Sequence, residues 1–204
     1  VDLAGNTSTA IGGTVTNIQT LIGGSAANTL IGANTPNAWT FTSGTSGTIN
    51  GNINFSNFAN VTGGNITNTF IVTDGMGIPT INGGGGIDTL DYTTTASNNT
   101  TFNLSGSGLT SSSGAAFNLT GISSVNLTSS SDNNTFTVSN WSGDAVFNNS
   151  GSANTYVVNF SGAGGSVTIA PASADNTLRI IGASGATTLN LTPSQISTPG
   201  DTVD

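Results

Sequence analysis

Hydrophobic and polar residues alternate in short runs of about five residues along much of the chain. In the segment 134–138, Phe136 and Val138 would share one face of a strand with Asn134, and Thr135 and Thr137 would face the other way. No segment shows the sustained 3.6-residue spacing of an amphipathic helix. The pattern therefore predicts an all-β protein of short strands. In the second half of the chain these strands are expected at 124–127, 134–138, 145–147, 154–158, 166–169, 176–180 and 187–191.

The strands are marked by a recurring triplet of Asn or Asp, Thr and a hydrophobic residue. Most intervals between triplets are multiples of about 21 residues, which is typical of repeat architectures. Expected strand centres lie about ten or eleven residues apart, so each repeat holds two strands. The sequence thus predicts one domain over residues 1–204: a parallel β-solenoid with coils of about 21 residues and two or three short strands per coil.

Each residue of the triplet has a predicted place in the coil. The hydrophobic residue faces the core, and the Thr residues point outward in a row. The Asn side chain lies at an inward corner, where its amide can bond both its own turn and the next coil. The predicted Asn/Asp ladder consists of Asn28, Asn68, Asp88, Asn134, Asn154 and Asn176. Asp88 interrupts it with a carboxylate, which needs a donor or a cation beside it.

Two polar stretches interrupt the regular pattern. Residues 93–101 are rich in Thr and Asn, and residues 105–114 are rich in Ser and Gly. Both compositions favour loops. We expect these two segments to protrude from the stack of coils.

The charged residues of the chain indicate which kinds of partner it can bind. The nine acidic residues are all Asp, Arg179 is the only base, and the formal net charge is −8. Nucleic-acid phosphates and anionic membrane surfaces are bound by clustered Lys and Arg, so neither is an expected partner. No run of eighteen apolar residues is present, and membrane insertion is not expected. Without Cys, disulfides and thiolate metal sites are excluded.

The stretch from Leu30 to Tyr92 resembles the β-strand repeats of large bacterial surface proteins of the filamentous-haemagglutinin and calcium-binding repeat-adhesin type. The similarity lies in the segments 28–32, 47–51, 68–72 and 81–92. It implies a β-solenoid that extends an adhesin or fibre away from a bacterial cell. The expected location is therefore extracellular or on the cell surface.

One segment matches a calcium-binding motif. Residues 83–91 fit the nonapeptide G-G-x-G-x-D-x-U-x of calcium-binding β-rolls, with Asp88 as the acidic ligand. The matching positions of other coils hold neutral Asn, so an Asp tolerated in an Asn ladder is the competing interpretation. Asp88 is the single calcium candidate, and no other cofactor is expected.

No catalytic residues are predicted. The chain has no His, Cys, Lys or Glu, which removes most general acids, bases and nucleophiles. Asp88 and Asp91 are three residues apart and would face opposite sides of a strand. The chain is therefore expected not to be an enzyme.

The first functional hypothesis is a structural subunit or segment of an extracellular fibre or adhesin stalk. An uncapped solenoid leaves open strand edges that pair with other chains. The predicted assembly edges are Val1, Asp2, Leu3, Thr202, Val203 and Asp204, which would stack head to tail into a homo-oligomer or filament. The alternative is a binding module whose protruding loops recognise a glycan or a host surface.

Overall fold

The structure is a computed structural model that describes residues 1–5, 16–73, 76, 80–95, 99–159, 165–173, 175–182, 189–190 and 202–203. These residues form strands and turns only, which confirms the all-β prediction. Within these ranges, no helix is long and apolar enough to cross a membrane.

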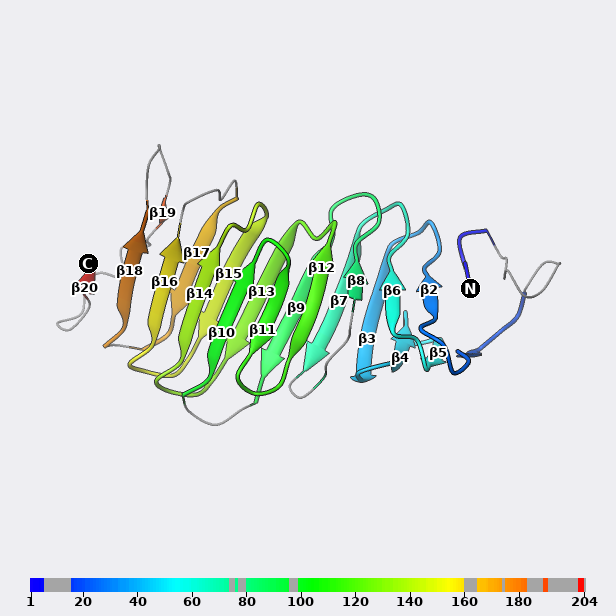
Figure 1. The fold of residues 1–204 in the computed structure, drawn as a ribbon, viewed down its shortest axis with the longest axis horizontal. Helices are drawn as coiled ribbons and strands as arrows, with labels where there is room; N and C mark the ends of the chain where they lie inside the picture. Colours follow the sequence, from blue (N-terminus) through cyan, green and yellow to red (C-terminus); the bar gives the residue numbers. More distant parts are fainter. Residues whose placement is uncertain are drawn as a thin grey trace.

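Two ten-stranded sheets lie face to face along one long axis (Figure 1). In spatial order, sheet 1 consists of β1 (Thr20–Ile22), β5 (Ile53–Ser56), β4 (Ser46–Ile49), β3 (Asn37–Ser43), β7 (Asn68–Thr73), β9 (Thr89–Thr94), β13 (Ser124–Ser129), β15 (Asp144–Asn149), β17 (Val167–Pro171) and β19 (Leu189–Asn190). Sheet 2 consists of β2 (Thr29–Ile31), β6 (Asn60–Thr62), β8 (Thr80–Asn82), β12 (Ala116–Thr120), β11 (Gly108–Ser111), β10 (Thr101–Ser105), β14 (Thr135–Ser139), β16 (Thr155–Asn159), β18 (Thr177–Ile181) and β20 (Thr202–Val203).

From β13 onward, the chain alternates strictly between the two sheets. Thr135 pairs with Thr155 and Thr155 with Thr177, in parallel register along sheet 2. Ladder contacts between successive strands of that sheet join residues 20 or 22 positions apart. A repeat in this part of the molecule is one strand in each sheet with its two turns, close to the predicted length. All seven strands expected in the second half have a counterpart, although residues 187, 188 and 191 of the last one lie outside the described residues.

Each sheet also contains one antiparallel meander. In sheet 1, β3, β4 and β5 pair antiparallel, and in sheet 2, β10, β11 and β12 do the same. Each meander runs back toward the N-terminal end of its sheet. Its last strand pairs with an earlier parallel strand (β5 with β1, and β12 with β8), and its first strand pairs with a later one (β3 with β7, and β10 with β14).

The sheet-2 meander corrects the predicted loop at 105–114 and shortens the one predicted at 93–101, of which residues 96–98 lie outside the described residues. β9 continues to Thr94, β10 occupies residues 101–105, and β11 occupies residues 108–111 as a central strand of the sheet. Phe102, Leu104 and Leu109 are fully buried and anchor these strands. The Ser and Gly residues that resembled a loop lie mainly on the outer face and at the turns, where small side chains suffice.

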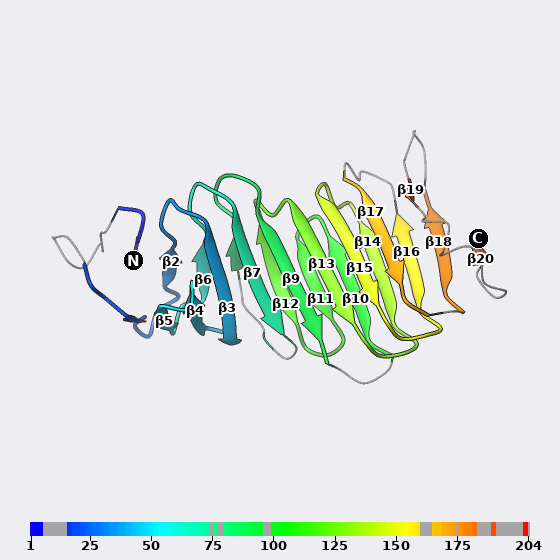
Figure 2. The same ribbon diagram turned by 180° about the vertical axis from the view of Figure 1, so that it is seen from behind.

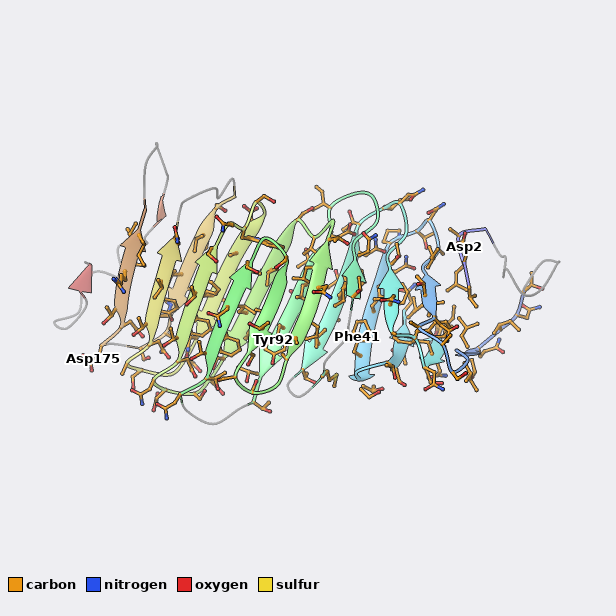
Figure 3. All side chains as sticks on the ribbon, viewed as in Figure 1. Asp2, Phe41, Tyr92 and Asp175 are labelled. Atoms are coloured by element: carbon orange, nitrogen blue, oxygen red, sulfur yellow. The ribbon has the colours of Figure 1, made fainter. Side chains whose placement is uncertain are left out.

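The buried hydrophobic side chains form one cluster between the sheets. Aromatic rings stack from repeat to repeat within it: the Phe102 and Phe136 centroids are 5.0 Å apart, and those of Phe136 and Tyr156 are 5.2 Å apart. Trp39 stacks on Phe70 near the other end of the cluster, at 5.9 Å. Figure 3 labels two members of this cluster, Phe41 and Tyr92, at separate points along the sheets. Parallel register places like residues on like residues, which produces these ring stacks.

The outward Thr residues lie in two rows rather than the single row predicted. Thr69 and Thr89 are in register on sheet 1, whereas Thr135, Thr155 and Thr177 are in register on sheet 2. The triplet at residues 88–90 leads into β9 of sheet 1, whereas the next one, at residues 134–136, leads into β14 of sheet 2. Thr101 of β10 extends the sheet-2 row, although no triplet marks it.

The chain ends lie at opposite ends of the long axis (Figure 2). Asp2 forms a parallel bridge with Ile31, so residues 1–3 lie beside β2 at one end of sheet 2. Thr202 and Val203 form β20, which pairs with β18 at the other end of the same sheet. Five of the six predicted edge residues are thus placed at the two ends of sheet 2. Asp204 lies outside the described residues.

Candidate functional site

The most developed polar feature of the molecule is a pair of side-chain ladders at the strand starts. Asn134, Asn154 and Asn176 precede β14, β16 and β18 and form the sheet-2 ladder. Asn37 and Asn68, the first residues of β3 and β7, and Asp88, which precedes β9, form the sheet-1 ladder. The single predicted ladder is therefore two ladders on different sheets.

In the sheet-2 ladder, each amide bonds its own turn and the neighbouring repeat. The Asn154 side chain donates to Gly151 O at 2.7 Å, and its Oδ1 accepts from the backbone N of Asn134 at 2.9 Å. Asn176 Oδ1 in turn accepts from the backbone N and the Nδ2 of Asn154, at 3.0 and 3.1 Å. All three Asn side chains are buried. These bonds satisfy backbone groups that the bend between sheets would leave unpaired.

A backbone feature of this ladder went unrecognised in the sequence. The residue before each ladder position has a positive φ: 56° at Asn133, 56° at Ala153 and 66° at Asp175. Asn99, with φ 69°, has the same place before Thr100, whose backbone N donates to Asn134 Oδ1 at 3.0 Å. Asn and Asp tolerate the left-handed region of backbone conformation. An Asn or Asp directly before a ladder residue was therefore the sequence signal for this turn.

The sheet-1 ladder begins at Asn37. Its Nδ2 donates to Asn68 Oδ1 at 2.9 Å, and Asn68 donates from both its backbone N and its Nδ2 to Asp88 Oδ1, each at 2.8 Å. The sequence marked Asn37 only as a weak form of the triplet, because Ala38 replaces the Thr. Thr is not needed there, since the position faces outward.

Asn28 belongs to neither ladder. Its amide donates to Gly24 O at 2.9 Å and Ala26 O at 2.7 Å, both in its own turn. The pairing of Thr29 with Asn60 places Ala59 beside Asn28, and Ala59 has no polar side-chain atom to continue the row. Asn28 is also less buried than the other predicted ladder residues.

Among the residues that the structure describes, Asp88 is the one acid in the core. Its side chain is fully buried; Oδ1 accepts the two Asn68 bonds, and Oδ2 has no hydrogen-bond partner. Burial raises the pKa of this carboxyl, while the hydrogen bonds from Asn68 act in the opposite direction.

The surroundings of Asp88 do not fit the calcium site suggested by its sequence motif. The neighbouring sheet-1 positions are Asn68 and Ser123, which bring no second carboxylate. Asp91 lies on the outer face, where its Oδ1 accepts from Asn126 Nδ2 at 2.6 Å. In the part of the chain that the structure describes, no group of three or more His, Cys, Asp or Glu could hold a metal ion.

A shallow polar groove of about 500 Å³ crosses the turns that precede β9, β13, β15 and β17. Its lining is mostly glycine backbone, with Ser123, Ser142 and Asp144 as the polar side chains. Asp144 Oδ1 accepts from Ser166 N at 3.0 Å and from Ser166 Oγ at 2.7 Å, and these two bonds lower the pKa of Asp144. Trp141 lies close by, but it is buried and its Nε1 donates to Asp144 O at 3.2 Å.

Comparison of the chain with protein-family models, with curated proteins and with solved structures finds no match.

Proposed function

We propose that this protein is a β-solenoid that serves as a structural segment of an extracellular bacterial fibre or adhesin stalk. The observation that carries the proposal is the pair of long sheets over one shared core, in which side-chain ladders and ring stacks join successive repeats. With ten strands per sheet at about 4.8 Å each, the stack is roughly 45 Å long. A stack of this kind is a stiff spacer.

The low charge and single Arg support the same function. A chain without Lys and with one Arg offers almost no site to proteases that cleave after basic residues. Few long charged side chains are available to block an edge, and edge charge is a common device against unwanted pairing. These properties suit a segment that assembles outside the cell.

Assembly is proposed to use the two ends of sheet 2. Val1 O and Leu3 N bond to Ile31 of β2, each at 2.9 Å. In a parallel ladder, the backbone groups of the residue between them point the other way, so Asp2 N–H and C=O face the open edge. A second copy whose β20 edge meets this edge would extend the sheet, and repetition gives an open filament.

Electron microscopy of the purified chain tests the proposal with two variants of Asp2. Asp2→Pro removes the outward N–H and leaves the Val1 and Leu3 bonds to Ile31 available, whereas Asp2→Ala keeps that N–H and serves as the matched control. Both variants lose the carboxylate that accepts from Ala4 N and Gly5 N. Filaments from wild type and D2A but not D2P are expected, with the same circular dichroism for all three. Dispersed wild-type monomers at high concentration would count against filament assembly.

Glycan binding is the second candidate function, and the polar groove over the glycine turns is the observation that favours it. Close backbone approach and Ser hydroxyls suit the hydrogen-bonding groups of a sugar. A glycan array comparing wild type with Ser142→Val tests this candidate. Retention of a sugar that is unchanged in S142V, or no retention at all, would remove the groove from consideration.

A further inference from the structure

Asp88 occupies the place of an Asn amide. The turns 63–68 and 83–88 have the same length and the same position in successive repeats of sheet 1. A Cβ built on Gly63 would lie closer than 3.0 Å to both Gly83 O and Asn68 Nδ2. A Cβ built on Gly83 would lie closer than 3.0 Å to both Gly121 O and Asp88 Oδ2. Asp88 Oδ2 thus corresponds to Asn68 Nδ2, and Gly121 O corresponds to Gly83 O.

The two atoms differ in what they can donate. Asn68 Nδ2 donates to Gly83 O at 3.2 Å and to Ile66 O at 2.5 Å. An ionised Asp88 would place a negative oxygen beside the Gly121 carbonyl oxygen, in a site where Oδ2 is shielded from solvent. Two acceptors that face the same buried site are unfavourable, because neither donates a hydrogen bond to the other.

No charged side chain around Asp88 compensates it. Arg179, the only basic residue of the chain, is exposed on β18 of the other sheet. The strands on either side, β7 and β13, and the segments 83–87 and 121–123 contain no titratable residue. On β9 itself, Asp91 faces outward and Tyr92 is buried in the core. Asp144, the first residue of β15 and two strands from β9 in the sheet, is a further acid and lines the groove beside Gly121.

We propose that Asp88 is a proton-binding site, whose carboxylic acid donates from Oδ2 to Gly121 O and so continues the Asn ladder into the next repeat. The acid replaces the amide as donor, while Oδ1 still accepts from Asn68. The raised pKa of this carboxyl agrees with that assignment. The proton joins β9 to the segment that leads into β13, across the point where the β10–β12 meander is inserted.

The proton makes the stability of this junction depend on pH. Because burial raises the folded-state pKa above the unfolded value, the folded protein binds more protons than the unfolded chain between these two values. The stabilisation from Asp88 is complete below the unfolded pKa and is lost as pH rises through the folded pKa. Within that window, the unfolding equilibrium constant contributed by this one proton rises by up to about tenfold per pH unit.

Two variants and an infrared measurement test the site. Asp88→Asn supplies the ladder amide permanently, and Asp91→Asn makes the same charge change on the outer face of the same strand. At neutral pH, wild type and D91N should show the carbonyl stretch of a protonated carboxylic acid, and D88N should lack it. Denaturant unfolding between pH 4 and 9 measures stability as a function of pH. Wild type and D91N should lose stability as pH rises through the folded-state pKa of Asp88, and D88N should not show this loss.

Two results would overturn the assignment. One is a wild-type spectrum at neutral pH without the carboxylic-acid band, which would mean that Asp88 is ionised. The other is a stability gain on adding Ca²⁺, reversed by chelator and absent from D88N, which would mean that a cation holds the position. We expect that neither Ca²⁺ nor chelator changes the infrared spectrum or the pH dependence of stability.

Discussion

Asn134 and Asn154 lie one repeat apart, and the side chain of the second accepts the backbone N–H of the first at 2.9 Å. The Asn154 amide also donates to Gly151 O in its own turn and to Asn176 Oδ1 in the next repeat. One buried side chain thus connects three successive repeats of sheet 2. In the sheet-1 ladder, Asp88 accepts the backbone N–H of Asn68 in the same way.

Asn154→Ala should be strongly destabilising. The substitution leaves the buried backbone N–H of Asn134 without its acceptor and removes one of the two donors to Gly151 O, because the Ser173 hydroxyl still donates to that carbonyl. The expected cost is about 2 kcal/mol in the free energy of unfolding. Asn103→Ala, on the exposed face of β10, is the matched control and should change stability by less than about 0.5 kcal/mol. Urea unfolding measures both. Equal losses of stability in the two variants would show that the ladder hydrogen bonds do not stabilise the fold.

Tyr156→Phe should stabilise the protein. The Tyr156 ring packs against both Phe136 and Phe147, but its hydroxyl is buried without a hydrogen-bond partner, and burial raises its pKa. Removing the hydroxyl keeps the ring contacts and removes an unsatisfied polar group, a gain of about 1 kcal/mol. Thermal unfolding checks the sign. Tyr156→Leu, which also removes the ring, should be destabilising by contrast.

Ala153→Asn should also be stabilising. Ala153 has a φ of 56°, whereas the equivalent positions in neighbouring repeats hold Asn133 and Asp175. Asn populates the left-handed region more readily than Ala, so a gain of about 0.5–1 kcal/mol is expected from this exposed site. Ala116→Asn, in the extended β12 strand, makes the same chemical change and should be neutral or destabilising. A gain at both positions would exclude the backbone explanation.

The second half of the molecule was predictable because each of its strands is marked by a pattern within a few neighbouring residues. The alternation around Phe136 and Tyr156 identifies the strands, and the spacing of Asn134, Asn154 and Asn176 gives the repeat. The sheet-2 meander was missed although its strands are close in sequence, because the composition of β11 favours a loop. Leu109 alone carries the core signal of β11, and Ser and Gly surround it.

The sheet assignment of the ladders was equally inaccessible. Asn68 and Asn134 stand in similar triplets. Between them, however, the chain crosses from sheet to sheet an odd number of times, so the two residues lie on different sheets. Counting crossings requires knowing that β10, β11 and β12 stay in one sheet. The failure at Asn28 has a similar cause, since it depends on Ala59 becoming its neighbour. Asp88 was recognised as the exception in the ladder, whereas its unpartnered oxygen needed the structure.

Asp144→Asn should reduce the acid-side pH dependence of stability. The Ser166 bonds lower the folded-state pKa of Asp144 below its unfolded value. Its contribution is therefore present above the unfolded pKa and is lost as pH falls through the folded pKa, opposite in direction to Asp88. Because Asp144 is exposed, the change should be small and should weaken in high salt. Unfolding curves below pH 5 compare wild type with D144N; an identical acid slope would contradict the assignment.

Gly83→Ala should be among the most damaging substitutions in the protein. Gly83 has no unusual φ, so the reason is space: a Cβ there would lie closer than 3.0 Å to the backbone oxygen of Gly121 and to Asp88 Oδ2. Neither atom belongs to a flexible side-chain end, because Asp88 is held by Asn68. Separating the repeats enough to fit a methyl group should cost roughly 3 kcal/mol or more. Gly24→Ala, where a Cβ meets nothing within 4 Å, is the matched control and should be neutral to mildly stabilising. Similar unfolding midpoints for G83A and wild type would mean that this close approach between repeats is absent in solution.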